Sequence, residues 1–209
     1  MENSDFEIQG TTLTKYTGND STVVIPDGVK TLGFRSMEWL CGIKKIVLPE
    51  GVEVIYTDSI IGCQDLEEIN LPKSLVKIGG NAFRYTALRE LCLHDGIKEI
   101  GSCAFNGCKS LERVILPRGL VKIEDRLFCD CVSLHEIELP AGITYIGRGA
   151  FERSGIRRIV IPDGVTHISN FAFADCAELV DVYIPKSVTG IGKEAFFRSP
   201  NVVVHKETV

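Results

Sequence analysis

Cysteine is the residue type in this chain whose number and spacing could carry chemistry, because the sequence contains eight cysteines. Four of them fall in adjacent stretches as C-x4-C and C-x-C, at Cys103, Cys108, Cys129 and Cys131. Thiolates at short spacings can hold Zn²⁺ in a tetrahedral site, and two cysteines brought close together can form a disulfide. Zinc at these four residues, or a disulfide between Cys108 and Cys131, is therefore the chemical alternative to free thiols.

The way the cysteines recur favours free thiols. Four of them occupy one slot of a repeated phrase, at Cys63, Cys108, Cys131 and Cys176, whereas no slot is shared by Cys41, Cys92, Cys103 and Cys129. A buried cysteine at a repeated core slot acts as a small hydrophobe. A secreted disulfide framework would instead place its cysteines at consistent positions. We predict that all eight thiols are reduced, and that the chain binds no metal and no other cofactor.

The sequence shows neither a recurring histidine arrangement nor a common catalytic motif that would indicate an active site. No carboxylate or thiol recurs at a fixed offset from the histidines, which are His94, His135, His167 and His205. The chain has no glycine-rich phosphate loop and no G-x-S-x-G motif. We predict that the protein is not an enzyme.

The residues around the cysteines belong to a phrase that repeats every 22 or 23 residues. Proline, replaced once by histidine, marks each repeat at Pro26, Pro49, Pro72, His94, Pro117, Pro140, Pro162 and Pro185. Eleven residues later comes an apolar side chain, at Met37, Ile60, Phe83, Phe105, Phe128, Phe151, Phe173 and Phe196. A fixed period of this length predicts a solenoid in which each repeat forms one coil.

Each repeat has a readable plan. Apolar residues alternate before the proline, as at Leu91 and Leu93, which predicts a short strand with one face inward. Proline ends the strand, and a glycine two residues later predicts a tight corner. A second apolar pair follows, and then Ala-Phe. Stacking the coils places like residues above one another, so we predict one buried column at Phe83, Phe105, Phe128, Phe151, Phe173 and Phe196.

The pattern L-x-x-I-x-I-P-x-G-V-x-x-I-x-x-x-A-F-x-x-C-x-x-L resembles the BspA-like leucine-rich repeat family of bacterial and protozoan proteins, over about residues 22–202. The resemblance implies a leucine-rich-repeat solenoid, a right-handed coil of eight units with a concave parallel β-sheet. The chain would be mostly β and turn, with short helical or 3-10 segments. Met37 and Ile60 depart from the Ala-Phe phrase, which predicts less regular packing of the first two coils.

The two ends of the array should differ from its middle. Residues 1–21 are expected to form a capping hairpin, residues 22–202 the eight repeats, and residues 203–209 a terminal strand and tail. Strands are expected to include Ile46–Leu48, Leu91–Leu93 and Val182–Ile184. Val202–Val204 should form a ninth strand at an open edge, which predicts weak self-association.

Two columns of side chains should point outward from the concave sheet. Charges alternate along one column, which could pair vertically, at Glu90, Arg113, Glu136, Arg158 and Asp181. The other column is largely apolar, at Val47, Asn70, Cys92, Ile115, Glu138, Val160 and Tyr183. Strand propensity and a protein-binding surface both explain an apolar column. These twelve residues are the candidate protein-binding site.

Composition limits the partners. A net charge of −5 and scattered Lys and Arg provide no field that attracts a phosphate backbone, so nucleic acid is excluded as a partner. The chain has no apolar run long enough for a membrane span, and MENSDFEIQG is not a signal peptide. Free cysteines and the missing signal favour a cytoplasmic location. The family resemblance implies the cell surface if the chain is a piece of a longer exported protein.

We predict a non-catalytic module that presents its concave surface to another protein. Two alternatives remain open. One is a fragment of a surface adhesin that recognises a host or matrix protein. The other is a structural spacer, whose stacked charges only keep the solenoid soluble.

Overall fold

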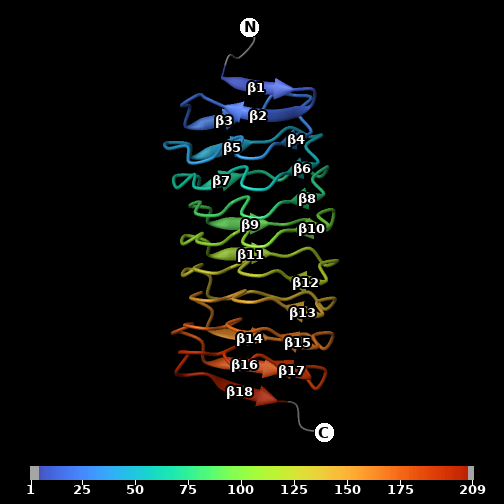
Figure 1. The fold of residues 1–209 in the computed structure, drawn as a ribbon, viewed down its shortest axis with the longest axis vertical. Helices are drawn as coiled ribbons and strands as arrows, with labels where there is room; N and C mark the ends of the chain where they lie inside the picture. Colours follow the sequence, from blue (N-terminus) through green and yellow to red (C-terminus); the bar gives the residue numbers. More distant parts are fainter. Residues whose placement is uncertain (1–4, 207–209) are drawn as a thin grey trace.

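The computed structural model describes residues 5–206, and these form a stack of coils with the two ends of the chain at opposite ends of the stack (Figure 1). Most coils contribute a short strand to each of two faces of the stack, where neighbouring strands pair in parallel. The strands of one face, called here the first sheet, are β3 (Thr22–Val24), β5 (Lys45–Val47), β7 (Glu68–Ile69), β9 (Glu90–Cys92), β11 (Arg113–Ile115), β14 (Arg158–Val160), β16 (Asp181–Ile184) and β18 (Val203–Lys206). They pair in three groups, β3–β5–β7, β9–β11 and β14–β16–β18.

The second sheet runs along the other side of the stack (Figure 1). Its strands are two residues long, namely β4 (Thr31–Leu32), β6 (Val54–Ile55), β8 (Lys77–Ile78), β10 (Glu99–Ile100), β12 (Lys122–Ile123), β13 (Tyr145–Ile146), β15 (His167–Ile168) and β17 (Gly190–Ile191). They pair in two groups, one ending at β10 and the other beginning at β12. The sequence predicts only one sheet, because a strand of two residues shows no alternation. From β4 to β15 the second residue of each strand in this sheet is buried, as in the pairing of Ile146 with Ile168, whereas Ile191 of β17 in the last coil is exposed.

A hairpin precedes the first coil. Strand β1 (Phe6–Gln9) pairs antiparallel with β2 (Thr12–Tyr16), and Gly10 takes a positive φ of 62° in the turn between them. Strand β2 then pairs in parallel with β4, so the hairpin covers the N-terminal edge of the second sheet. The expected tail beyond Lys206 lies outside the described residues.

The boundaries of the first-sheet strands differ slightly from the prediction. Strands β5 and β9 begin one residue before the expected Ile46 and Leu91 and end one residue earlier, and β16 begins at Asp181. The terminal strand runs over Val203–Lys206 instead of Val202–Val204. The reason is that the outward residue on each side of the inward one also joins the ladder, as the pairing of Lys45 with Glu68 shows.

The Ala-Phe segments form turns, and the described residues contain no helical or 3-10 segment, so that part of the prediction is wrong. In each of the first seven coils two residues, four apart, take left-handed backbone angles, as Arg126 (φ 53°) and Asp130 (φ 60°) do in the fifth coil. Left-handed residues prevent a continuous right-handed helix. The two left-handed residues orient the amide groups of the residues between them along the axis of the stack. The N–H of Phe128 therefore donates to Ala150 O in the next coil, at 2.8 Å.

This arrangement recurs in coil after coil and is called here the turn ladder. The N–H of Phe105 donates to Leu127 O at 3.2 Å, and the N–H of Phe151 donates to Ala172 O at 2.8 Å. The first coils follow the same rule, because the N–H of Met37 donates to Ser59 O at 2.8 Å. Met37 and Ile60 are fully buried. The expectation of less regular packing in the first two coils is therefore wrong.

The predicted phenylalanine column is confirmed. Successive rings stack with centroids 5.3–5.8 Å apart, from Phe83 through Phe105, Phe128, Phe151 and Phe173 to Phe196. The first five are fully buried, and Phe196 in the last coil is partly buried. This column is the centre of a single core that runs the length of the stack.

The repeated cysteine slot holds a column of hydrogen-bond donors beside the rings. Thr86 in this slot donates to Phe83 O of its own coil. At five other positions the side chain donates to the carbonyl of the preceding coil's Phe-column residue, as Cys131 Sγ does to Phe105 O at 3.2 Å and Ser199 Oγ does to Phe173 O at 2.7 Å. The same bond is made by Cys63, Cys108 and Cys176. These buried cysteines are therefore more than small hydrophobes, because each thiol adds a hydrogen bond to a buried carbonyl.

We expect Cys131→Ala to lower the free energy of unfolding by about 0.5–1.5 kcal/mol, because the buried carbonyl of Phe105 keeps only the N–H of Cys108 as a donor. Cys131→Ser should cost less, since serine fills the same slot at Ser154 and Ser199. Urea unfolding followed by circular dichroism measures both values. If Cys131→Ser destabilises the protein as much as Cys131→Ala, the thiol stabilises the protein through its packing and not through its hydrogen bond.

Candidate functional site

The pairing of the first-sheet strands is interrupted at two places. Strands β7 and β9 do not pair with each other, and in the sixth coil, where the sequence predicts a strand, residues 136–139 form none. None of the backbone N–H or C=O groups of these four residues makes a hydrogen bond with another described residue. The prediction of a strand in every coil is wrong here. Glu136 and Glu138 occupy two successive outward positions of this segment, and glutamate has a low propensity for strands.

The interruption in the sixth coil opens a groove of about 1030 Å³ between β11 and β14. It extends from Val114 and Arg118 in the fifth coil to Val160 and Asp163 in the seventh. A second hollow of about 360 Å³ shares Arg158 and Val160 with it and continues to Tyr183 and β18. The outward face of the first sheet thus carries one hollowed region over its C-terminal half.

The floor of the groove is apolar and slightly open to solvent. Ile137 and Leu139 line it; Leu139 is 8% exposed and Ile137 is partly buried. Ile69 and Leu71 in the coil of β7 are partly buried as well, so this degree of exposure also occurs outside the groove.

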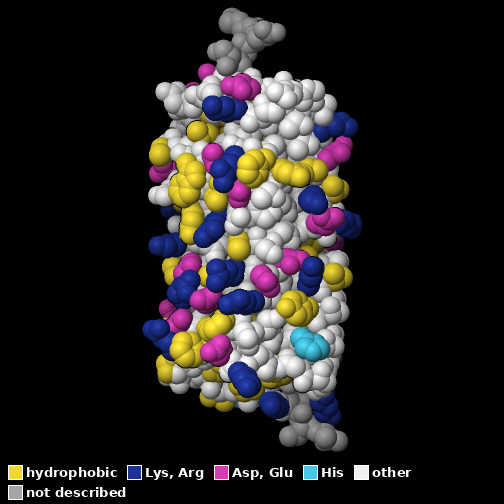
Figure 2. Space-filling model, in the orientation of Figure 1, with side chains coloured by type: hydrophobic (Ala, Val, Ile, Leu, Met, Phe, Trp, Pro, Cys, Tyr) yellow, Lys and Arg dark blue, Asp and Glu magenta, His cyan; other side chains and the backbone are white. Residues whose placement is uncertain are grey.

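The charged column does not pair as predicted in this region. Lys45 and Glu68 form an ion pair of 2.8 Å in the first half of the sheet. Among the described residues, no ion pair links members of the series Glu90, Arg113, Glu136 and Arg158. Figure 2 shows hydrophobic and charged side chains side by side over the visible face, without one large patch of either kind. The charges near the groove are available to a partner.

Tyr183 organises the C-terminal part of the surface. The Arg158 guanidinium carbon lies 4.8 Å from the centroid of the Tyr183 ring. On the other side, the His205 ring stacks on Tyr183 at 4.5 Å and its Nε2 lies 2.7 Å from an Asp181 oxygen. These four residues form one contact cluster across β14, β16 and β18.

The structure does not bring all twelve candidate residues to one open surface. Ile115 and Val160 are 46% and 55% exposed, and Cys92 is also exposed. Val47 is partly buried, and the Asn70 amide is occupied, because it accepts from Leu48 N at 2.7 Å and donates to Leu48 O at 2.8 Å. The candidates that share the hollowed region are Glu136, Glu138, Arg158, Val160 and Tyr183.

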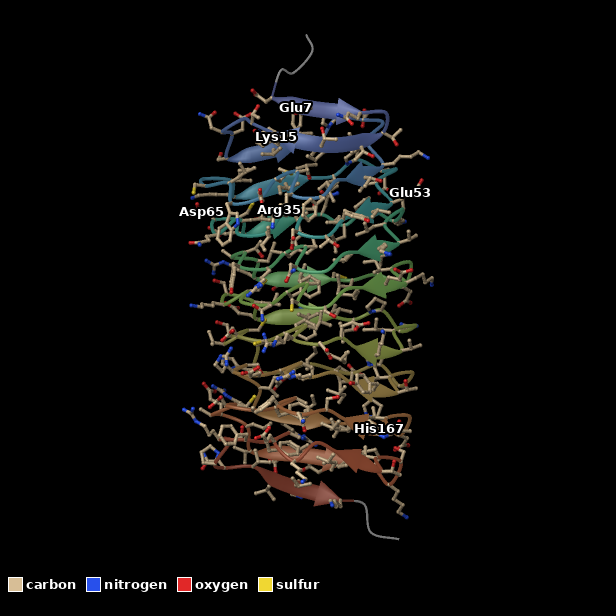
Figure 3. All side chains as sticks on the ribbon, in the orientation of Figure 1. Glu7, Lys15, Arg35, Glu53, Asp65 and His167 are labelled. Atoms are coloured by element: carbon tan, nitrogen blue, oxygen red, sulfur yellow. The ribbon has the colours of Figure 1, made fainter. Side chains whose placement is uncertain are left out.

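The cysteines are free thiols in the structure, and no group of three or more potential metal ligands occurs within residues 5–206. Burial raises the pKa of Cys108 to about 11, and burial next to Asp130 raises the pKa of Cys129 to about 12. The histidines are dispersed, and His167 lies on β15 of the second sheet (Figure 3). The described residues also contain no helix that is long and apolar enough to span a bilayer.

We expect a thiol reagent to modify Cys41 and Cys92 first in the folded protein, because these two are exposed. Cys108 and Cys131 should react only on unfolding, since a thiol must ionise to react and burial raises both pKa values. A titration in denaturant should then count all eight thiols. A lower count, or zinc in stoichiometric amount, would contradict free, metal-free cysteines.

Comparison with known proteins places the chain among bacterial repeat proteins. A model described as BspA type leucine-rich repeat region, in six copies, matches residues 15–112 and 76–203. The chain is 27% identical to a leucine-rich repeat protein from Bacteroides ovatus, with a TM-score of 0.69 over 88% of this chain and 55% of that one. A leucine-rich repeat protein of T. pallidum is 26% identical, with a TM-score of 0.62 over 92% and 85%.

A leucine-rich cell surface protein from Faecalibacterium prausnitzii shares the fold, at 24% identity and a TM-score of 0.59 over 97% of this chain and 74% of that one. The chain spans about half the length of the B. ovatus protein. No curated protein shows significant similarity to it.

Proposed function

The chain belongs to the BspA-type leucine-rich repeat family, and from this we propose that it is a non-catalytic protein-binding module. Its binding surface is the outward face of the first sheet over coils five to eight. The observation that carries the proposal is the interrupted ladder at residues 136–139, which opens the groove. A spacer would have no use for a groove of this size.

The composition of this surface supports binding. Its centre carries exposed aliphatic side chains at Ile115 and Val160 and an aromatic ring at Tyr183, with arginine beside it. Aromatic and arginine side chains carry much of the energy of protein interfaces. A more specific form of this proposal is that the chain is a fragment of a surface adhesin. The similarity in fold to a cell surface protein from F. prausnitzii supports a test of this form.

The test compares two doubly substituted proteins that lose the same kinds of side chain from different sheets. Ile115→Ser with Tyr183→Ser alters the proposed surface. Val121→Ser with Tyr145→Ser removes an exposed aliphatic and an exposed aromatic side chain beside or on the second sheet. Each protein is used to capture partners from the native source, and captured proteins are quantified by mass spectrometry.

A binder predicts that a specific protein is retained by the wild type and by the second-sheet control and is lost from the first-sheet variant. A spacer predicts that the three captured sets are the same. Circular dichroism of both variants shows whether loss of capture reflects the surface or loss of the fold.

Strand β18 adds a proposal for self-association. It pairs with β16 on one side, and its other edge has no partner among residues 5–206. Val203 and Val204 are exposed. We expect the apparent mass in light scattering to rise with concentration, and Val204→Lys to suppress the rise by placing a charge on the edge. A constant monomer mass would show that this edge does not self-associate.

A further inference from the structure

The groove on the first sheet carries an excess of negative charge. Three carboxylates line it, at Glu136, Glu138 and Asp163, against the guanidiniums of Arg118 and Arg158. None of the three carboxylates forms an ion pair or a side-chain hydrogen bond with another residue in the described range.

Two guanidiniums also belong to the groove. Arg158 lies against the Tyr183 ring, and Arg118 Nε lies 3.9 Å from an oxygen of Asp95, a fourth carboxylate just outside the groove. Both guanidiniums keep their charge, so the three carboxylates leave the groove with a small net negative charge.

The carboxylates stand beside apolar contacts of the kind that a peptide side chain can use. Ile137 and Leu139 alternate with Glu136 and Glu138 along the same segment, and the partly opened floor lies below. In an extended segment, residues two apart project from the same face with a rise of about 6.6 Å. Cationic side chains at alternate positions of an extended ligand have the same spacing.

The backbone of the segment offers a further contact. Because residues 136–139 have no ladder partners, their N–H and C=O groups are open to water or to a ligand that supplies both donors and acceptors. A peptide main chain supplies both, whereas an isolated cation can satisfy only carbonyls and carboxylates.

We propose that the groove binds an extended segment of another protein in which lysine or arginine alternates with apolar residues. This rests on the proposed function and narrows it from an unspecified protein to a basic and apolar peptide. Glu136 and Glu138 select the positive charge, and the floor at Val114, Ile137 and Leu139 receives the apolar side chains.

Three short fluorescent peptides of equal length serve as probes, one alternating Lys with Val, one Glu with Val and one Lys with Ser. Affinities are measured by fluorescence anisotropy at physiological salt. The variant Glu136→Gln with Glu138→Gln removes the two groove carboxylates. The control Glu90→Gln with Glu112→Gln removes two exposed carboxylates of the first-sheet side that do not line the groove.

We expect the Lys-Val peptide to bind most tightly, the Lys-Ser peptide more weakly, and the Glu-Val peptide not at all. The affinity for the Lys-Val peptide should fall about tenfold or more in the groove variant and less than about twofold in the control variant. Equal losses in both variants would show unspecific charge attraction and overturn the proposal. Absence of Lys-Val binding, or preference for the Glu-Val peptide, would also overturn it.

The two proposals fail on different results. Suppose that Ile115→Ser with Tyr183→Ser loses a captured partner, whereas Glu136→Gln with Glu138→Gln retains that partner and binds the Lys-Val peptide as tightly as the wild type. The protein is then a binding module, and the proposed selectivity for basic peptides is wrong.

Discussion

Phe128→Ala is expected to lower the free energy of unfolding by about 3–5 kcal/mol, the largest loss of any substitution considered for this protein. The Phe128 ring is fully buried and stacks between Phe105 at 5.7 Å and Phe151 at 5.6 Å. The backbone around it is fixed by the turn ladder on both sides, so neighbouring coils cannot collapse into the space. The cavity therefore persists and adds to the lost apolar contacts.

Urea unfolding monitored by circular dichroism measures the change, and Phe197→Ala provides a matched control. Phe197 follows the column residue of the last coil and is 48% exposed. Its removal should cost less than about 1 kcal/mol. Similar losses at positions 128 and 197 would show that the phenylalanine column does not hold the stack together.

Gly107→Ala is expected to lower the free energy of unfolding by about 2–4 kcal/mol, for two reasons that add. Gly107 has a positive φ of 73°, which strains any residue with a Cβ. In addition, the new methyl group would overlap the Tyr85 ring, which lies directly over Gly107 from the preceding coil. The N–H of Gly107 also donates to Cys129 O in the turn ladder, so the backbone at position 107 cannot move away from the Tyr85 ring without breaking this bond.

A double-mutant cycle separates the two causes. In Gly107→Ala combined with Tyr85→Ala, the overlap is gone and only the backbone strain remains. The alanine at position 107 should therefore cost less when Tyr85 is absent. If the cost is the same in both backgrounds, the ring does not constrain this turn, and the steric part of the explanation is wrong.

The solenoid could be predicted because its signal is periodic. Phe83 to Phe196 recur at the same offset from each corner, and a stack of like coils is the arrangement that buries all of them. The donor role of Cys131 also had a signal, since Ser154 and Ser199 fill the same slot and share with cysteine only a small size and a donor.

The turn ladder had no such signal. Arg126 and Asp130 adopt left-handed angles although neither is glycine, and hydrogen bonds between neighbouring coils hold them there. The groove was missed for a related reason. Glu136 and Glu138 fit the outward columns by position, and only the missing ladder bonds of their segment distinguish them from the outward residues of intact strands.

The turn ladder also gives the stack an electrical direction. The peptide unit between Ser59 and Ile60 accepts from Met37 at its carbonyl and donates to Ala82 at its N–H, so its dipole lies along the stack axis. Equivalent units in successive coils point the same way, each with a dipole of about 3.5 D. Unlike an α-helix, this face has its positive end toward higher residue numbers.

In the eighth coil, the N–H groups of Phe196 and Arg198 have no acceptor within residues 5–206. Whatever packs against that coil must present carbonyls or carboxylates to them.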